Sequence, residues 1–349
     1  MKKHAIIPVF ISHRGCPNDC VFCNQKRITA RSGDVTPETA RRTIEQHLST
    51  LENMQLETVE LAFFGGSFTG IPLEEQTAFL ALANEYKTAG RIDKIHLSTR
   101  PDYINEEILD NLKRFDADVI ELGVQSFDEE VLRLSGRGHD AAVVYKSSQL
   151  IKDYGFSLGI QLMIGLPGDS IEKCVFSANE TVKIAPEIAR LYPTVVIKET
   201  ALYDAYLSGL YIPLNEEEAV LRTAEMYKIL DAAGINIIRV GLKSSDIISS
   251  ETAFHPAFRQ LVEGHIARER LEAALESALE NALESASHET ADAQPQKVLF
   301  LSNEKCYNNI FGHKAVNRRY FEAKYPQLQI SGGIDAALAN NEYTVKLQK

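Results

Sequence analysis

Short runs of apolar, β-branched residues alternate with longer amphipathic stretches over the first two-thirds of the chain. This alternation is typical of βα units, in which helices join parallel strands and cover the sheet. The sequence predicts strands at residues 5–12, 58–64, 94–98, 119–124, 157–164 and 189–197. It predicts helices between them at residues 37–51, 73–86, 105–114, 141–154 and 171–184. We therefore expect an α/β fold with a parallel sheet.

A further helix is predicted at residues 216–233 and a last strand at residues 235–240. Parallel strands with crossover helices either close partway into a barrel or remain an open, doubly wound sheet, and the pattern alone does not distinguish the two. In both architectures ligands bind at the carboxyl ends of the strands. The residues at those ends are therefore the first candidates for function.

The chain changes character after about residue 245. Residues 263–287 are dense in Ala, Leu and Glu and place their apolar residues on one helical stripe. This pattern favours a solvated helix with one packed face over a coiled coil that binds a partner. Residues 288–296 are polar and are predicted to form a linker, so we expect three parts: a core at 1–245, a helical segment and linker at 246–296, and an extension at 297–349.

The extension is predicted to be a small α+β unit. We expect strands at residues 297–301, 328–331 and 343–347 and helices at residues 314–324 and 334–339. Such an extension could cover one mouth of a barrel.

Three cysteines lie close together in the stretch Cys16-Pro-Asn-Asp-Cys20-Val-Phe-Cys23. Three soft ligands on one short loop indicate a metal site. A closed structural zinc site needs four protein ligands, and no other CxxC or HxxxH pair in the sequence supplies the remainder. A cubane iron–sulfur cluster on three thiolates instead leaves one iron open to a ligand. A zinc or iron–sulfur module without turnover remains the non-enzymatic alternative.

The composition sets broad limits on location and thiol state. The chain has 349 residues and no apolar run near the roughly 18 that suggest a membrane span. The apolar run at residues 5–11 lacks the features of a signal peptide, so we expect a cytoplasmic protein without a membrane partner. An odd number of cysteines, five, favours reduced thiols, with Cys174 and Cys306 as single residues.

The formal net charge of −11 gives no overall field that would attract a polyanion. A nucleic-acid partner would therefore have to bind a local basic patch. Two sets of basic residues are candidates: Arg14, Lys26, Arg27 and Arg31, and Lys314, Arg318, Arg319 and Lys324.

The cysteine spacing C-x3-C-x2-C, with Phe22 just before the third cysteine, resembles the cluster loop of radical S-adenosylmethionine (SAM) enzymes. The resemblance implies that Cys16, Cys20 and Cys23 hold a [4Fe-4S] cluster. It also implies that the open iron chelates the amino and carboxylate groups of SAM, and that Phe22 packs against the loop.

The second predicted strand ends in a glycine pair followed by a serine, Gly65, Gly66 and Ser67. Paired glycines let backbone groups approach a ligand closely, although a tight strand-to-helix turn explains them equally well. In position and type this stretch resembles the glycine motif with which radical SAM enzymes hold the methionyl ammonium.

Polar residues also follow the third and fourth strands, at Ser98 and Gln125, and Arg137 lies farther along. The alternative explanation is structural: these residues cap the helix that follows. Together they resemble the run GVQSF…RGH of the branch that contains anaerobic coproporphyrinogen oxidase and the radical SAM subunit of Elongator. The resemblance implies that Gln125 and Arg137 contact the cofactor, and an arginine fork suits the SAM carboxylate.

The resemblance continues through the fifth strand, with Gln161 and a GLPG turn, and the sixth, with Tyr192. It covers residues 4 to about 243 and implies a partial (β/α)6 barrel of the radical SAM type. Ser98, Gln161 and Tyr192 are then further cofactor contacts. The stretch 312–317 is weakly similar to the end of the Elongator radical domain, which suggests substrate contact as an alternative to plain packing.

The implied activity is reductive cleavage of SAM to a 5′-deoxyadenosyl radical, with an electron donor such as flavodoxin or ferredoxin. The substrate is open: tRNA, as in Elongator-like RNA modification, or a small metabolite, as in a tetrapyrrole enzyme like coproporphyrinogen oxidase. Coproporphyrinogen oxidases carry another cysteine two positions after the third ligand, where this chain has Gln25. Elongator enzymes add an acetyltransferase domain, for which we expect no room in 349 residues.

Overall fold

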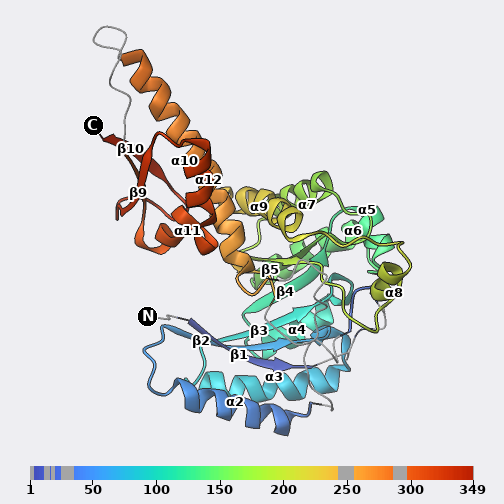
Figure 1. Ribbon diagram of the computed structural model, residues 1–349. Coiled ribbons are helices and arrows are strands. Elements are labelled where there is room, and N and C mark those ends of the chain that lie inside the picture. The colour runs from blue at the N-terminus through green and yellow to red at the C-terminus, as the bar shows by residue number, and fades with distance from the viewer. Residues whose placement is uncertain are drawn as a thin grey trace. The chain divides into compact units, whose positions relative to one another are not determined.

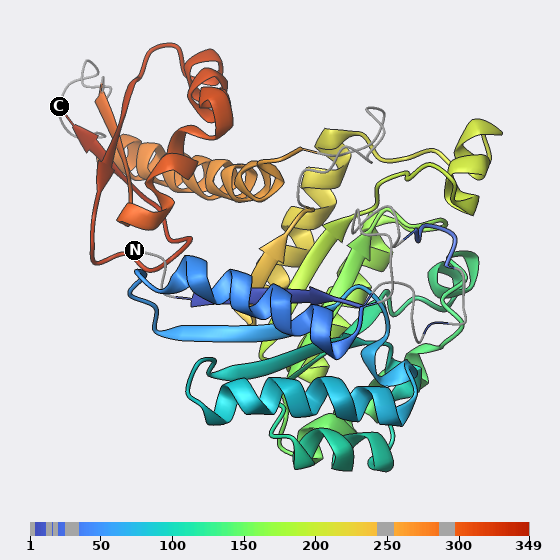
Figure 2. The same cartoon turned by 90° about the horizontal axis from the view of Figure 1, so that it is seen from below.

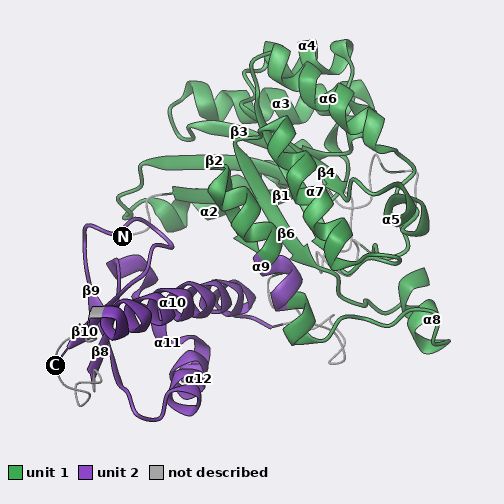
Figure 3. Cartoon of the chain, turned by 90° about the horizontal axis from the view of Figure 1, so that it is seen from above, with its two compact units in different colours: residues 1–219, 225–254 green, residues 220–224, 255–349 purple. Residues whose placement is uncertain are grey.

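The structure is a computed structural model that describes residues 4–11, 16, 20–24, 35–242, 255–285 and 297–348. The chain divides into two compact units (Figure 3). The first comprises residues 1–219 and 225–254, and the second comprises residues 220–224 and 255–349.

The first unit is built on a seven-stranded sheet in which the strands follow one another in chain order (Figure 1, Figure 2). The strands are β1 (His4–Phe10), β2 (Thr58–Phe64), β3 (Lys94–Thr99), β4 (Val119–Gln125), β5 (Ser157–Ile164), β6 (Ile188–Pro193) and β7 (Asn236–Val240). All neighbouring pairs are parallel. A doubly wound sheet reverses its strand order partway. This sheet does not, and it curls into the partial barrel that was predicted.

Helices connect these strands. They are α2 (Pro37–Leu51), α3 (Leu73–Thr88), α4 (Glu106–Arg114), α5 (Glu129–Leu134), α6 (Ala141–Asp153), α7 (Ile171–Ile184), α8 (Ala201–Leu207) and α9 (Glu216–Ala232). Most begin at a side chain that accepts a backbone hydrogen bond, as Asn105, Asp140 and Ser170 do. The predicted helices are confirmed, whereas α5 and α8 were not predicted. The predicted strand at 189–197 ends earlier, at Pro193.

The two faces of the sheet differ in chemistry. Phe63 of β2 is 1% exposed and contacts Phe79 of α3, with ring centroids 5.9 Å apart, so its face is covered by helices. Side chains alternate between faces along a strand. Glu60 and Phe64 therefore lie on the opposite, inner face, and the guanidinium of Arg190 lies 5.0 Å from the Phe64 ring on that face. The inner face is where charged side chains gather.

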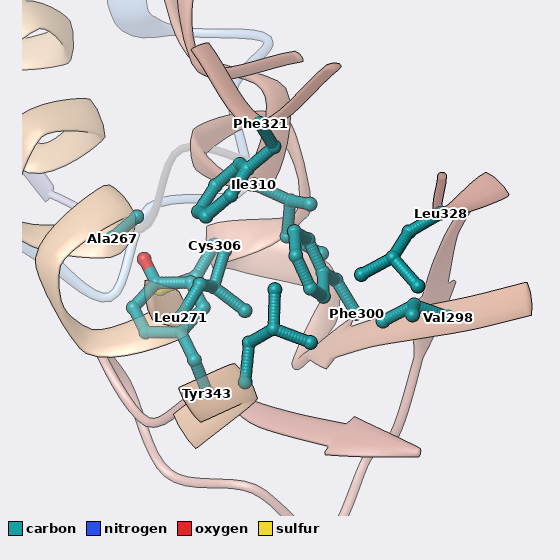
Figure 4. Packing of buried hydrophobic residues seen from close by; sticks show 10 residues of the cluster. Ala267, Leu271, Val298, Phe300, Cys306, Ile310, Phe321, Leu328 and Tyr343 are labelled. Atoms are coloured by element: carbon teal, nitrogen blue, oxygen red, sulfur yellow. The ribbon is translucent and has the colours of Figure 1, made fainter. Parts of the chain in front are cut away.

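The second unit pairs one long helix with a small sheet (Figure 1). Its elements are α10 (Phe258–Ser285), β8 (Lys297–Ser302), α11 (Tyr307–Phe311), α12 (Val316–Lys324), β9 (Gln329–Ile334) and β10 (Thr344–Gln348). The strand order is β10-β8-β9, with β9 parallel and β10 antiparallel to β8. The sequence placed the long helix in a segment of its own. In the structure, α10 contributes Ala267, Leu271 and Leu275 to the same core as Phe300 and Phe321 (Figure 4).

One prediction in this unit is wrong. The helix expected at residues 334–339 does not form, because Ile334 pairs with Ser302 as the last residue of β9 and the following residues form turns. The backbone amide of Asp335 then donates to the Ser302 carbonyl (2.8 Å), which continues the strand contact. The predicted linker at 288–296 lies outside the described residues. None of the helices described here combines the length and the apolar character that a membrane crossing requires.

Candidate functional site

The cysteine loop is described at Cys16 and at residues 20–24. Cys20 is 5% exposed, and the Cys23 amide donates to the Cys20 carbonyl (2.9 Å), which makes a tight turn. The Val21 amide donates to the carbonyl of Ser135, just after α5 (3.1 Å), and the amide of Leu202 in α8 donates to the Val21 carbonyl (2.8 Å). The two helices that the sequence did not predict thus hold the loop.

Phe22 packs against apolar residues outside the cysteine loop. Together with Val21 it lies against a small apolar cluster formed by Val196, Leu202 and Tyr211. Burial of apolar surface therefore supports the loop from the side of α8.

Two arginines approach the cysteines. Nη1 of Arg137 donates to the Cys20 sulfur at 3.3 Å, and Nη1 of Arg100 lies 4.0 Å from the Cys16 sulfur. Within the described residues, no three His, Cys, Asp or Glu side chains converge as ligands of one metal ion. Thiolates are the protein ligands of iron–sulfur clusters, so the chemistry of the three cysteines fits such a group.

Arg100 was not singled out from the sequence, although it directly follows β3. It is 4% exposed and donates to both carboxylate oxygens of Asp102 (2.9 and 2.8 Å) and to the Arg137 carbonyl (2.6 Å). Burial by itself lowers the pKa of Arg100, but the hydrogen bond to Asp102 and the nearby thiols raise it overall. Arg100 therefore stays cationic and ties the end of β3 to the Arg137 loop.

Gln125 and Arg137 lie beside each other at the end of β4. Gln125 has a φ of +71°, a left-handed conformation that is strained for a residue other than glycine. Oε1 of Gln125, Nε of Arg137 and both ring nitrogens of His139 are buried and have no hydrogen-bond partner in the described structure. Buried polar groups nearly always have partners. This group of atoms therefore fits a polar ligand such as SAM.

His139 completes this corner. Burial lowers its pKa first, and the charges of Arg137 and Arg100 lower it further, to about 4. His139 is therefore a neutral imidazole at physiological pH, and it adds no positive charge next to the cysteine loop.

The glycine turn follows β2. Gly65 has a φ of +102°, a backbone conformation that residues with a side chain rarely adopt, so the position favours glycine. Gly66 follows it directly. The hydroxyl of Ser67 contacts that of Thr99 (2.8 Å) and accepts from the Arg100 amide (3.2 Å), so Ser67 joins the ends of β2 and β3.

A buried ionic network occupies the inner face of the sheet. Glu121 of β4 is 0% exposed and pairs with Arg190 of β6, with 2.6 Å between Oε2 and Nε. Its other oxygen accepts from Ser98 (3.2 Å) and from Gln161. Nη1 of Arg190 donates to the Tyr192 hydroxyl (3.2 Å). Glu121 and Arg190, which the sequence analysis did not single out, therefore link Ser98, Gln161 and Tyr192 to one another, and the role of these three residues as cofactor contacts stays a prediction.

The network extends toward β2 through a histidine. Nδ1 of His96 lies 2.9 Å from Glu60, and its Nε2 lies 3.6 Å from Glu121. Burial by itself raises the pKa of Glu121, but the charges of Arg190 and His96 hold it at about 2. Burial lowers the pKa of His96, yet Glu121 and Glu60 raise it overall. The sequence offered one signal for this network, because its ionisable residues lie within strands that are otherwise mostly apolar.

Comparison with known families agrees with this arrangement. Residues 10–179 match the Radical SAM superfamily, and residues 186–268 match the Radical_SAM C-terminal domain. These two stretches contain the cysteine loop, Arg100 and Arg137, and the ionic network of Glu121 and Arg190.

Similar proteins point the same way. A tRNA uridine(34) acetyltransferase from Methanocaldococcus infernus is 32% identical over 258 residues, which is 62% of this chain and 48% of that protein. Elongator complex protein 3 of Schizosaccharomyces pombe is 32% identical over 250 residues, 59% of this chain and 46% of that protein. The chain thus spans about half the length of the curated relatives it matches.

Solved structures share the fold. Archaeal Elp3 from Methanocaldococcus infernus superimposes with a TM-score of 0.59 at 24% identity, over 77% of this chain and 64% of that one. Methylornithine synthase gives a TM-score of 0.50 at 16% identity, over 70% and 74% of the two chains. The chain belongs to the radical SAM superfamily, in the branch that resembles the radical SAM subunit of Elongator.

Proposed function

We propose that Cys16, Cys20 and Cys23 hold a [4Fe-4S] cluster and that SAM binds beside it at the carboxyl ends of the strands. The contact of Arg137 with the Cys20 sulfur, at 3.3 Å, is the observation that carries this proposal. It joins a predicted cofactor residue to a predicted cluster ligand, although the two lie 117 positions apart in the sequence. The unpartnered atoms of Gln125 and Arg137 add polar groups for SAM at the same corner.

The remaining predicted contacts have roles in the same proposal. Gly65, Gly66 and Ser67 offer backbone groups to the methionyl ammonium, and Phe22 packs under the loop. Ser98, Gln161 and Tyr192 offer polar groups on the inner face, where hydroxyls of a ribose would find partners. Glu121 and Arg190 hold these three side chains in place through the contacts described above.

A reduced cluster with SAM bound beside it would supply radical chemistry, the removal of a hydrogen atom from the substrate, with the electron coming from a donor such as flavodoxin or ferredoxin. The protein binds and orients SAM and the substrate and shields the site from water. Arg137 orients the SAM carboxylate with a planar fork of donors. Arg100 and Arg137 place positive charge beside the cysteine sulfurs. On the inner face, Glu121 and Arg190 are paired, so their charges balance each other.

We propose an RNA, of the tRNA class, as the substrate. The relatives named tRNA uridine(34) acetyltransferase and Elongator complex protein 3 support this class. They favour it over the tetrapyrrole alternative, as does Gln25 in place of a further cysteine. An electron donor such as flavodoxin or ferredoxin would reduce the cluster. A cytoplasmic location, where such a donor and tRNA are both present, is part of the same proposal.

Anaerobically reconstituted protein tests the proposal. We expect iron and acid-labile sulfide in equal amounts, and slow release of 5′-deoxyadenosine from SAM under reducing conditions. Unmodified tRNA should accelerate this release more than a fraction of small metabolites does, because a substrate that closes the site positions the reacting groups. One zinc without sulfide, or no deoxyadenosine under any reducing condition, would contradict the enzymatic proposal. Acceleration by the metabolite fraction alone would contradict the RNA class.

A further inference from the structure

Helix α12 belongs to the second unit (Figure 3), and three exposed cations lie in its first turns and just before it. They are Lys314, Arg318 and Arg319, and we call them the α12 basic surface. They lie beyond residue 268, where the second family match ends. Neither the cluster proposal nor the SAM proposal uses them.

The structure fixes the two arginines of this surface. The guanidinium carbon of Arg318 lies 4.3 Å from the ring centroid of Phe311. Phe311 is itself held against β9, because a side-chain carbon at Gly332 would come within 2.8 Å of its ring. An arginine stacked on an aromatic face keeps its N–H edge free for a phosphate. Arg318 is exposed to the solvent beside this ring.

Arg319 and Lys314 are held to each other. Nη1 of Arg319 donates to the Lys314 carbonyl at 2.7 Å. The turn below them is anchored by Asn317, which is 1% exposed and donates from Nδ2 to the carbonyls of Gly264 (2.8 Å) and Asn309 (3.0 Å). The surface therefore rests on an anchored turn, and the two arginine side chains have less freedom to lose when they bind a ligand.

The charges of this surface are not neutralised within the protein. Lys324, at the other end of α12, is ion-paired with Glu272 and Glu276. Across the described ranges, Lys314, Arg318 and Arg319 make no such pair, and Glu322, one helical turn after Arg318, does not pair with it. The chain as a whole has a net charge of −11, so these three cations without an acidic partner form a local region of positive charge.

We propose that the α12 basic surface binds the phosphate backbone of the RNA substrate. This inference rests on the proposed function, since it supplies a docking site for the substrate class named there. Lysine and arginine bind nucleic acids by displacing condensed counterions from phosphates, which needs local rather than overall positive charge. The stacked Arg318 and the fixed Arg319 suit the bidentate geometry of a phosphate oxygen pair.

A salt titration tests the assignment. Fluorescently labelled, unmodified tRNA is titrated with the reconstituted holoenzyme at several KCl concentrations. The variant carries Lys314→Gln, Arg318→Gln and Arg319→Gln. The slope of log Kobs against log[salt] is negative, and each lost phosphate contact reduces its magnitude by roughly 0.7 to 0.9. We expect the slope to fall by about 2 to 3 and the affinity at low salt to drop about tenfold or more.

A matched control removes three exposed cations elsewhere. Lys94→Gln, Lys297→Gln and Lys346→Gln change the net charge by the same amount, and these residues are exposed on β3, β8 and β10. We expect the control to keep the wild-type slope. The single variant Lys314→Gln, whose side chain is exposed, guards against misfolding and should lower the slope by about 1.

The outcomes separate this inference from the proposed function. Release of 5′-deoxyadenosine from SAM alone should be unchanged in the triple variant. Wild-type tRNA binding in the triple variant, or an equal loss in the control, would overturn the α12 surface and leave the proposed function standing. Equal binding of duplex DNA of the same length would overturn its assignment to RNA. If the wild-type protein does not bind tRNA even at low salt, both proposals fail.

Discussion

Glu121 and Arg190 form an ion pair of 2.6 Å on the inner face of the sheet, with side chains that are 0% and 9% exposed. Both charges have lost most of their hydration, and that cost is offset only if each keeps its partner. Glu121 also accepts from Ser98 and Gln161, so a single carboxylate joins β3, β4, β5 and β6. The stability of the barrel and the order of its inner face therefore depend on the same group.

We expect Glu121→Gln to lower the free energy of unfolding by about 3–5 kcal/mol, the usual cost of removing one partner of a buried ion pair and leaving the other charge unpaired. The neutral amide cannot balance the Arg190 charge, although it keeps nearly the same shape. Chemical denaturation followed by circular dichroism measures the change.

Two control variants define this effect. Glu85→Gln removes a carboxylate from an exposed pair with Arg41 and should change stability little. Glu121→Leu combined with Arg190→Leu should cost less than the sum of the two single variants, because no charge is left unpaired. A fully additive double variant would contradict the coupling of Glu121 to Arg190.

Stability should fall on the acid side through Glu121. Its pKa in the folded protein, about 2, lies below the ordinary value of 4.5, so the folded state favours the ionised form. The resulting stabilisation is complete above the ordinary value and is lost as the pH falls from about 5 toward 2. Unfolding measured across this range should show a steeper loss in the wild-type protein than in Glu121→Gln. Identical pH profiles would mean that Glu121 carries no such linkage.

His96 should act in the opposite direction. Its pKa is raised in the folded protein by Glu121 and Glu60, against the lowering effect of burial. The stabilisation is therefore fully present below about pH 6.5 and declines as the pH rises through the raised pKa. We expect the free energy of unfolding to decrease on this alkaline side, and His96→Asn to remove that decrease while lowering stability at pH 6. A profile in His96→Asn that still falls would assign the effect to another group.

The alternation of strands and helices could be predicted because it depends on local periodicity. The short helices α5 and α8 could not, since six or seven residues carry too little of an amphipathic pattern. What defines α8 is a distant contact, the bond from Leu202 to Val21 in the cysteine loop. The wrong helix at 334–339 has a similar origin, because the pairing of Ile334 with Ser302 depends on a strand more than thirty residues earlier.

The candidate site divides in the same way. Resemblance located the cysteines, the glycine turn, Gln125 and Arg137, and the structure places Arg137 beside Cys20. The resemblance did not single out Glu121 and Arg190, because these residues matter through their ion pair, and the two lie 69 positions apart in the sequence. A lone glutamate within an apolar strand shows that something balances its charge, but the sequence does not reveal which residue.

We expect Cys20→Ala to abolish the cluster. Anaerobically reconstituted wild-type protein should show the broad visible absorbance of thiolate-to-iron charge transfer, and the variant should lose it because one iron loses its ligand. Cys174→Ala is the matched control, since Cys174 is also buried but lies in the first turn of α7 and donates to Asp169, just before that helix. An intact four-iron cluster in Cys20→Ala would show that the ligands are misassigned.

The affinity for SAM should depend on Arg137. We expect Arg137→Ala to weaken SAM binding by about 1.5–3 kcal/mol, the range for a hydrogen bond to a charged group, while the cluster absorbance remains. Arg137→Lys keeps the charge near Cys20 but loses the planar fork, so it should recover only part of the affinity. Equilibrium dialysis with labelled SAM on the reconstituted protein measures all three forms. Equal affinity in all of them would show that Arg137 serves the cysteine loop alone, through its contacts with Cys20 and the Gly123 carbonyl.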